Sequence, residues 1–193
     1  MGSEMCIRDS DPTHHHITRT DSMVPGYAIN SSHDANGYHW SYDWNADQNQ
    51  RNVLMKVAEC YGKDLIVEGF SNSPPYFMTN SGCSSGSVNA GENNLREDAY
   101  GAFASYLADV AQHFSKEWGI HFQSMTAMNE PDTEYWHALS DKQEGCHFDP
   151  GESQSVMIIA LREALDERGL NDILISGTDE TCLLYTSPSP RDP

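Results

Sequence analysis

Apolar residues recur along the middle of the chain at two different spacings. Some gather in short segments that are typical of buried strands; these segments are 65–70, 120–128 and 173–176. Others recur every three or four residues, as on the buried face of a helix; these stretches are 53–61, 103–118 and 156–165. Helices and strands therefore alternate, and this order predicts parallel strands joined by helical crossovers.

Polar residues and glycines mark the expected ends of these helices. Asp47, with Gln50 three residues later, forms a capping signal before the first helix. Asp149 is placed to cap the third helix. Gly119 and Gly169 follow the last apolar positions of the second and third helices, where a left-handed residue commonly ends a helix.

The two loops that lead from a strand into a helix are long, and they cover residues 71–93 and 131–148. Loops of this kind lie at the carboxyl ends of parallel strands, where α/β proteins build their sites. The chain contains neither Gly-x-Gly-x-x-Gly nor Gly-Lys-Ser/Thr, so nucleotide binding has no support. The pattern alone leaves two architectures open, a doubly wound sheet and a (β/α)8 barrel.

Composition narrows the classes of function. The 193 residues carry 29 acidic side chains against 11 lysines and arginines, a formal net charge of −18. Contacts to phosphate groups need basic side chains, so the charge argues against nucleic-acid or anionic-membrane binding. No run of about 18 apolar residues occurs, so no membrane span is expected. The first 25 residues lack the apolar core of a signal peptide.

Both ends of the chain lack any periodicity. Residues 1–10 (MGSEMCIRDS) and 181–193 (TCLLYTSPSPRDP) resemble translated sequencing-adapter read-through at the ends of metagenomic reading frames. The alternative is a pair of flexible native ends. We expect two non-native tails, which leaves residues 11–180 as the native domain.

Three cysteines lie within this native segment, and none has the C-x-x-C spacing of a zinc ribbon or a thioredoxin-type site. Cys60 falls in the pattern of the first helix and is expected to be a small core residue. Cys83 and Cys146 lie in the two long loops. They form either a disulfide or two free thiols, and the sequence leaves both open.

Asn129-Glu130-Pro131 stands at the end of the second strand. A carboxylate at that place projects from a rigid element into the space above the sheet, and Asn129 adds an amide beside it. Proton transfer in catalysis needs such a positioned carboxyl group with a polar partner. The alternative is a turn that only ends a strand, since Pro131 removes a backbone donor.

Aromatic residues crowd the same two loops. Tyr76 and Phe77 follow the first strand, and Tyr135 and Trp136 follow Glu130. Flat apolar faces with polar rims suit stacking on sugar rings, although loop packing explains most single aromatics. Several on one expected face favour a carbohydrate cleft.

Further polar residues are candidates for the same site. Asp179 and Glu180 follow the third strand and could supply a second carboxylate, a sugar ligand or solvated loop charges. His14, His15 and His16 are consecutive, and three consecutive side chains do not converge on one ion in a helix or strand. We therefore expect no metal site.

Four stretches resemble glycoside hydrolase family 30, and within it the endo-β-1,6-galactanase-like group. They are residues 16–27 (HITRTDSMVPGY), 68–79 (EGFSNSPPYFMT), 128–131 (MNEP) and 142–146 (KQEGC). The resemblance runs from about residue 11 to residue 180. It rests chiefly on the Ser-Asn-Ser-Pro-Pro and Gln-Glu-Gly-Cys blocks, because many related retaining glycosidases share Asn-Glu-Pro.

The resemblance implies an incomplete (β/α)8 TIM barrel that holds about strands 2–5. It implies that Glu130 is the general acid/base, that Asn129 binds the sugar 2-hydroxyl and that Asn72 lines the subsite at the scissile bond. Tyr76, Tyr135, Trp136 and Glu180 are the further expected substrate contacts. The family's nucleophile is a second Glu on strand 7, outside this chain, so we expect the chain alone to be inactive.

The implied reaction is retaining hydrolysis of β-linked polysaccharides or oligosaccharides, with no cofactor. A β-1,6-galactan is the favoured substrate, and export from the cell is expected from the family. Three alternatives stay open. They are a non-catalytic carbohydrate-binding barrel, a related β-glucanase, xylanase or glucosylceramidase specificity, and a metal-dependent hydrolase that uses the His-rich segment.

Overall fold

The computed structural model describes residues 2–7, 26–140 and 143–178. Four parallel strands form one sheet in the order β1-β4-β5-β6, and a separate antiparallel hairpin pairs β2 with β3. The strands are β1 (Gly2–Ile7), β2 (Ala28–Asp34), β3 (Gly37–Tyr42), β4 (Ile66–Ser71), β5 (Ser124–Thr126) and β6 (Leu174–Ile175). The helices are α1 (Gln48–Tyr61), α2 (Tyr100–Trp118) and α3 (Glu152–Glu167), with short 3-10 turns η2 (Gly62–Asp64) and η3 (Tyr76–Met78).

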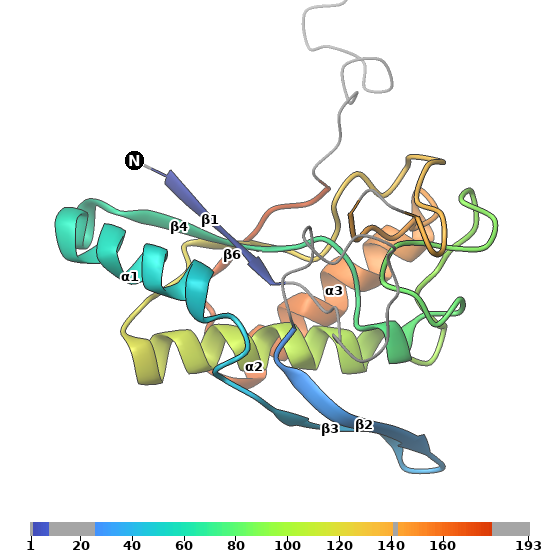
Figure 1. Ribbon diagram of the computed structural model, residues 1–193, viewed down its shortest axis with the longest axis horizontal. Coiled ribbons are helices and arrows are strands. Elements are labelled where there is room, and N and C mark those ends of the chain that lie inside the picture. The colour runs from blue at the N-terminus through green and yellow to red at the C-terminus, as the bar shows by residue number, and fades with distance from the viewer. Residues whose placement is uncertain (1, 8–25, 141–142, 179–193) are drawn as a thin grey trace, which may run out of the picture.

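The expected alternation of helices and parallel strands is confirmed from α1 to β6 (Figure 1). The expected strand at 120–128 is shorter, because only Ser124–Thr126 has strand geometry. Before it, the N–H of Ile120 turns back to the carbonyl of Phe114 and closes α2. Ile120 and Phe122 are buried core residues in this turn, so their apolar character imitates a longer strand.

Two of the expected helix ends differ in detail. Asp47 is the N-cap residue of α1, but its carboxylate accepts the hydroxyl of Tyr27 at 3.1 Å instead of capping the helix. α3 begins at Glu152 after Gly151, two residues later than Asp149 predicts, and Asp149 pairs with His147. Gly119 ends α2 in the left-handed conformation, as expected.

α2 supplies the centre of the hydrophobic core. Eight of its residues are buried, and they lie among the side chains that β4, β5 and α3 turn toward it. The fit is close at Gly69 of β4, where an added Cβ would lie 3.0 Å from the Met125 side chain. The helix-facing side of the sheet is therefore packed as a protein interior is.

The opposite side of the sheet is open. Ile66 and Leu174 point from it and are 57% and 70% exposed. On the same side the Glu68 carboxylate accepts hydrogen bonds from the hydroxyls of Ser124 and Ser176, which tie β4 to β5 and to the residue after β6. The sheet of the described residues does not close on itself, which agrees with part of a barrel.

The β2–β3 hairpin and β1 have no counterpart in the sequence prediction. A two-residue turn joins the hairpin, with Gly37 at φ +109° and the N–H of Asn36 bound to Asp34. Tyr42 stacks on Tyr106 of α2, so the hairpin packs on that helix (Figure 1). β1 lies within residues 1–10, and the foreign origin of that segment stays a prediction. No helix in the part of the chain that the structure describes is long and apolar enough to cross a membrane.

Candidate functional site

The carboxyl ends of β4 and β5 bring the main candidates to one edge of the sheet. Phe70 of β4 is in register with Thr126 of β5. Asn72 directly follows β4. Asn129 and Glu130 follow β5 after two intervening residues. Asn72 and Asn129 are buried, and Glu130 is half-buried. The edge expected from the sequence therefore exists, with two amides and one accessible carboxylate.

Glu130 has an unusual backbone. Its φ is +44°, in the left-handed region that residues other than glycine, Asn and Asp seldom adopt. Its carbonyl oxygen accepts three hydrogen bonds. The N–H and hydroxyl of Thr133 donate at 3.3 and 2.8 Å, and the indole N–H of Trp136 donates at 3.1 Å.

The Glu130 carboxyl group is held as well. The hydroxyl of Tyr135 donates to its Oε2. Tyr135 is 36% exposed and its ring lies against Trp136, with centroids 4.6 Å apart. Glu130 is thus fixed at both its main chain and its side chain while it stays open to solvent.

Trp136 does not offer a face to a sugar, and that expectation is wrong. Its side chain is 2% exposed. The indole ring packs against Gly145. The main-chain carbonyl of Trp136 lies against Gly86 and accepts the N–H of Ser87 at 3.0 Å. Trp136 is therefore a buried packing residue that connects the two long loops.

The other aromatic candidates of the first long loop contact the β2–β3 hairpin. Tyr76 is half-buried, and its hydroxyl lies 3.4 Å from that of Ser31 in β2. Phe77 packs against Tyr38 and Trp40 of the hairpin. Asp179, Glu180 and His14–His16 lie outside the described residues. Within them, no group of His, Cys, Asp and Glu side chains is arranged to hold a metal ion.

The Gln-Glu-Gly-Cys block contributes more than the sequence analysis assigned to it. Gly145 donates its N–H to the Ser84 carbonyl at 2.9 Å and so joins the two loops. Glu144 is fully buried beside it. Cys83 and Cys146 are both buried and free, and burial raises the pKa of the Cys146 thiol. Cys60 is exposed, against the expectation of a core residue, because it lies on the outer side of α1.

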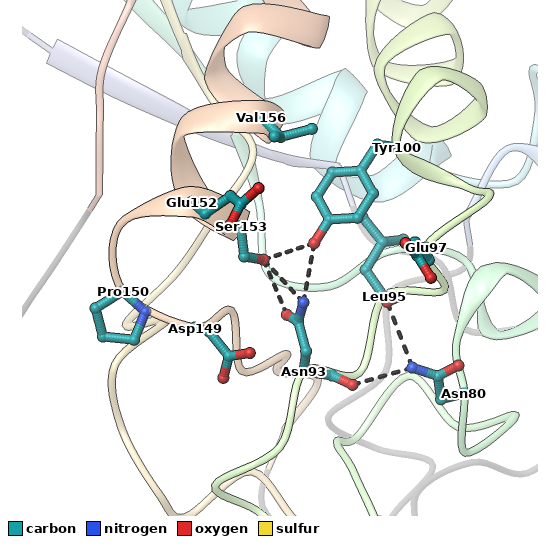
Figure 2. Close-up of a pocket in the computed structure, with 10 residues that line it drawn as sticks. All are labelled: Asn80, Asn93, Leu95, Glu97, Tyr100, Asp149, Pro150, Glu152, Ser153 and Val156. Carbon is teal, nitrogen blue, oxygen red and sulfur yellow. Dashed lines mark hydrogen bonds between the residues drawn. The ribbon is translucent and has the colours of Figure 1, made fainter.

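A cavity of about 810 Å³ lies between the N-terminal ends of α2 and α3 (Figure 2). The side chains of Asn93, Tyr100 and Ser153 bond one another at its floor, with Tyr100 and Ser153 hydroxyls 2.5 Å apart. The amide of Asn80 donates to two main-chain carbonyls of the same loop. These side chains bond one another and hold the N-terminal ends of the two helices together. Glu130 therefore remains the candidate catalytic residue.

The sequence model of O-Glycosyl hydrolase family 30 matches residues 30–190. The chain belongs to this family. It is 43% identical over 141 residues to an endo-beta-1,6-galactanase of Hypocrea rufa, a match that covers 73% of this chain and 28% of that protein. It is 30% identical over 181 residues to an exo-beta-1,6-galactobiohydrolase of Bifidobacterium longum, which covers 72% of this chain and 12% of the relative. The chain therefore spans less than a third of the length of either curated relative.

Solved structures agree on the fold. A conserved exported protein from Bacteroides fragilis superposes with a TM-score of 0.78 at 26% identity, over 98% of this chain and 36% of that one. The catalytic domain of a GH30 xylanase C from Talaromyces cellulolyticus superposes with a TM-score of 0.63 at 18% identity, over 89% of this chain and 35% of that one. The described sheet and helices thus correspond to part of a family 30 domain.

Proposed function

We propose that the protein carrying this chain is a retaining glycoside hydrolase that cleaves β-1,6-linked galactan, with Glu130 as general acid/base. The observation that carries the proposal is the placement of Glu130. It follows a barrel strand, stays open to solvent and has its main chain held by three hydrogen bonds. The two curated relatives, whose names both specify β-1,6-linked galactose, support the substrate class.

The chemistry needs a second carboxylate from outside this chain. That group attacks the anomeric carbon while Glu130 protonates the leaving oxygen, and Glu130 then deprotonates the incoming water. The two carboxyl groups lie about 5–5.5 Å apart in retaining enzymes. A carboxyl group that serves in both steps must keep one fixed orientation, which the contacts of Glu130 favour.

The neighbouring residues take supporting roles in this proposal. Asn129 and Asn72 bind sugar hydroxyls from the floor of the site, because both amides lie at the carboxyl edge of the sheet. Tyr76 and Glu180 are further sugar contacts. Tyr135 lies beside the carboxyl group that reacts. We also infer that the protein is exported, as a glycan substrate and the exported Bacteroides structure suggest.

The test replaces Glu130 with alanine in the full-length protein that carries this chain. A glycan with a poor leaving group needs protonation, whereas an aryl galactoside with a good leaving group does not. We expect kcat/KM for β-1,6-galactan to fall roughly 10²–10⁴-fold, the usual worth of a general acid, and the aryl substrate to lose far less in its glycosylation step. Glu134→Ala removes an exposed carboxylate from the same loop and is the matched control. Equal slowing of both substrates would count against the acid role.

A further inference from the structure

The left-handed backbone of Glu130 needs a cause. A residue with a Cβ is strained in this region and stays there only where its surroundings hold it. Among the described residues other than glycine, only Asn30, Glu130 and Leu139 have positive φ. The strain at Glu130 falls on the residue that carries the proposed acid.

A second turn in the same chain provides a comparison. Thr79 bonds the carbonyl of Tyr76, three residues earlier, through its N–H at 3.1 Å and its hydroxyl at 2.8 Å. Thr133 makes the same pair of bonds to Glu130. Tyr76 has no positive φ, so the two threonine bonds alone do not produce the left-handed residue. The indole N–H of Trp136 is the additional donor at Glu130.

Trp136 can reach that carbonyl only because two glycines leave room for it. A Cβ on Gly145 would lie 2.1 Å from the Trp136 ring, and a Cβ on Gly86 would lie 2.1 Å from the Trp136 carbonyl oxygen. The buried ring packs on Gly145, and the main chain of Trp136 packs on Gly86, about 60 residues earlier in the sequence. Trp136 therefore transmits the packing of both long loops to the main chain of Glu130.

We propose that Trp136 and Thr133 are positioning residues for Glu130, which hold its main chain left-handed and so aim its carboxyl group at the leaving oxygen. This inference rests on the proposed function. Neither side chain meets the substrate. Both act through a single acceptor, the carbonyl oxygen of Glu130.

The test compares Thr133→Val and Trp136→Phe with Thr79→Val in the full-length protein. Thr133→Val keeps the shape of the side chain and removes one donor to Glu130, and Thr79→Val removes the equivalent donor from the other turn. The measured quantity is the ratio of kcat/KM for β-1,6-galactan to kcat/KM for an aryl galactoside with a good leaving group. A misdirected acid lowers this ratio, whereas a general loss of folded protein lowers both terms alike.

We expect each positioning variant to lower the ratio roughly tenfold, because small misplacements of a catalytic group are costly. Thr79→Val should change it by less than about twofold while losing at least as much stability, since the Thr79 hydroxyl is buried and lies within bonding distance of the carbonyls of both Tyr76 and Cys83. An unchanged ratio in both positioning variants would overturn the proposal. If Glu130→Ala also leaves the ratio unchanged, the acid role itself fails; if Glu130→Ala lowers it and the two variants do not, only the positioning role fails.

Discussion

The substitution Gly145→Ala tests how the Trp136 ring is packed, because it adds one methyl group directly beside that ring. A Cβ built there lies 2.1 Å from Cδ2 and 2.2 Å from Cε3 of the ring. Gly145 has no positive φ, so alanine fits its backbone and the clash is the whole perturbation. Carbon atoms in ordinary contact are about 3.5 Å apart, so the ring or the loop must retreat by roughly 1.4 Å.

A retreat of that size has two consequences. Overpacking a tight interior costs about 1–3 kcal/mol. The Trp136–Glu130 hydrogen bond, now 3.1 Å, would also stretch beyond bonding distance if the ring moves away, at a further cost of about 1 kcal/mol. Gly145→Ala should therefore lower the free energy of unfolding by about 2–4 kcal/mol.

Gly101 provides the matched control. It lies in the first turn of α2, and a Cβ there meets nothing within 4 Å. The same Gly→Ala change should leave stability unchanged or raise it by up to about 1 kcal/mol, the difference in helix propensity. Urea unfolding of the full-length protein, followed by circular dichroism, measures both. Equal stabilities of the Gly145 and Gly101 variants would refute the packing of Trp136 described above.

Two further predictions concern titration and thiol chemistry. His113 stacks on Trp44 with ring centroids 3.7 Å apart, and burial lowers its pKa, so the folded state resists its protonation. Stability should therefore fall as the pH drops below about 6.5, the pKa of histidine in the unfolded chain. His113→Gln should weaken this pH dependence of the melting temperature between pH 7.5 and 5.5. Identical pH profiles of the two proteins would contradict this role of His113. Alkylation with iodoacetamide, read by mass spectrometry, should modify exposed Cys60 well before buried Cys83 and Cys146, because a raised pKa leaves little reactive thiolate at Cys146. Labelling of Cys146 at the rate of Cys60 in the native protein would show that the loops open.

The sequence predicts α2 well because this helix has one broad buried face. It predicts the faces of α1 and α3 less well, since Val53, Val156 and Ile159 were expected on buried faces and are exposed. α2 and α3 end within one or two residues of the expected glycines, since a left-handed residue after a helix is a local feature. The β2–β3 hairpin was not predicted, although Asp34, Asn36 and Gly37 are residues typical of a turn. Its aromatic side chains pack on a helix more than 60 residues later, as Tyr42 does on Tyr106, and no local pattern shows that contact.

The place of Glu130 was predictable for a general reason, because the carboxyl ends of parallel strands meet at one edge. Its conformation was not, since φ at Glu130 depends on a donor six residues later and on two glycines in different loops. The same contacts bury Trp136, which the sequence placed among the sugar contacts. Tyr135 and Trp136 are adjacent in sequence, yet one lies at the surface and the other is 2% exposed.

The Gln-Glu-Gly-Cys block acquires a physical meaning from this arrangement. It begins 13 residues beyond Glu130, so proximity in the sequence does not explain how it could act on that residue. Its Gly145 instead makes the space in which Trp136 reaches the Glu130 carbonyl, and its main chain bonds the loop that follows β4. A substitution in this block should therefore act on catalysis through the orientation of Glu130. The leaving-group ratio of Gly145→Ala should fall with that of Trp136→Phe, and the double variant should lose no more than the larger single effect, because both changes break the same contact.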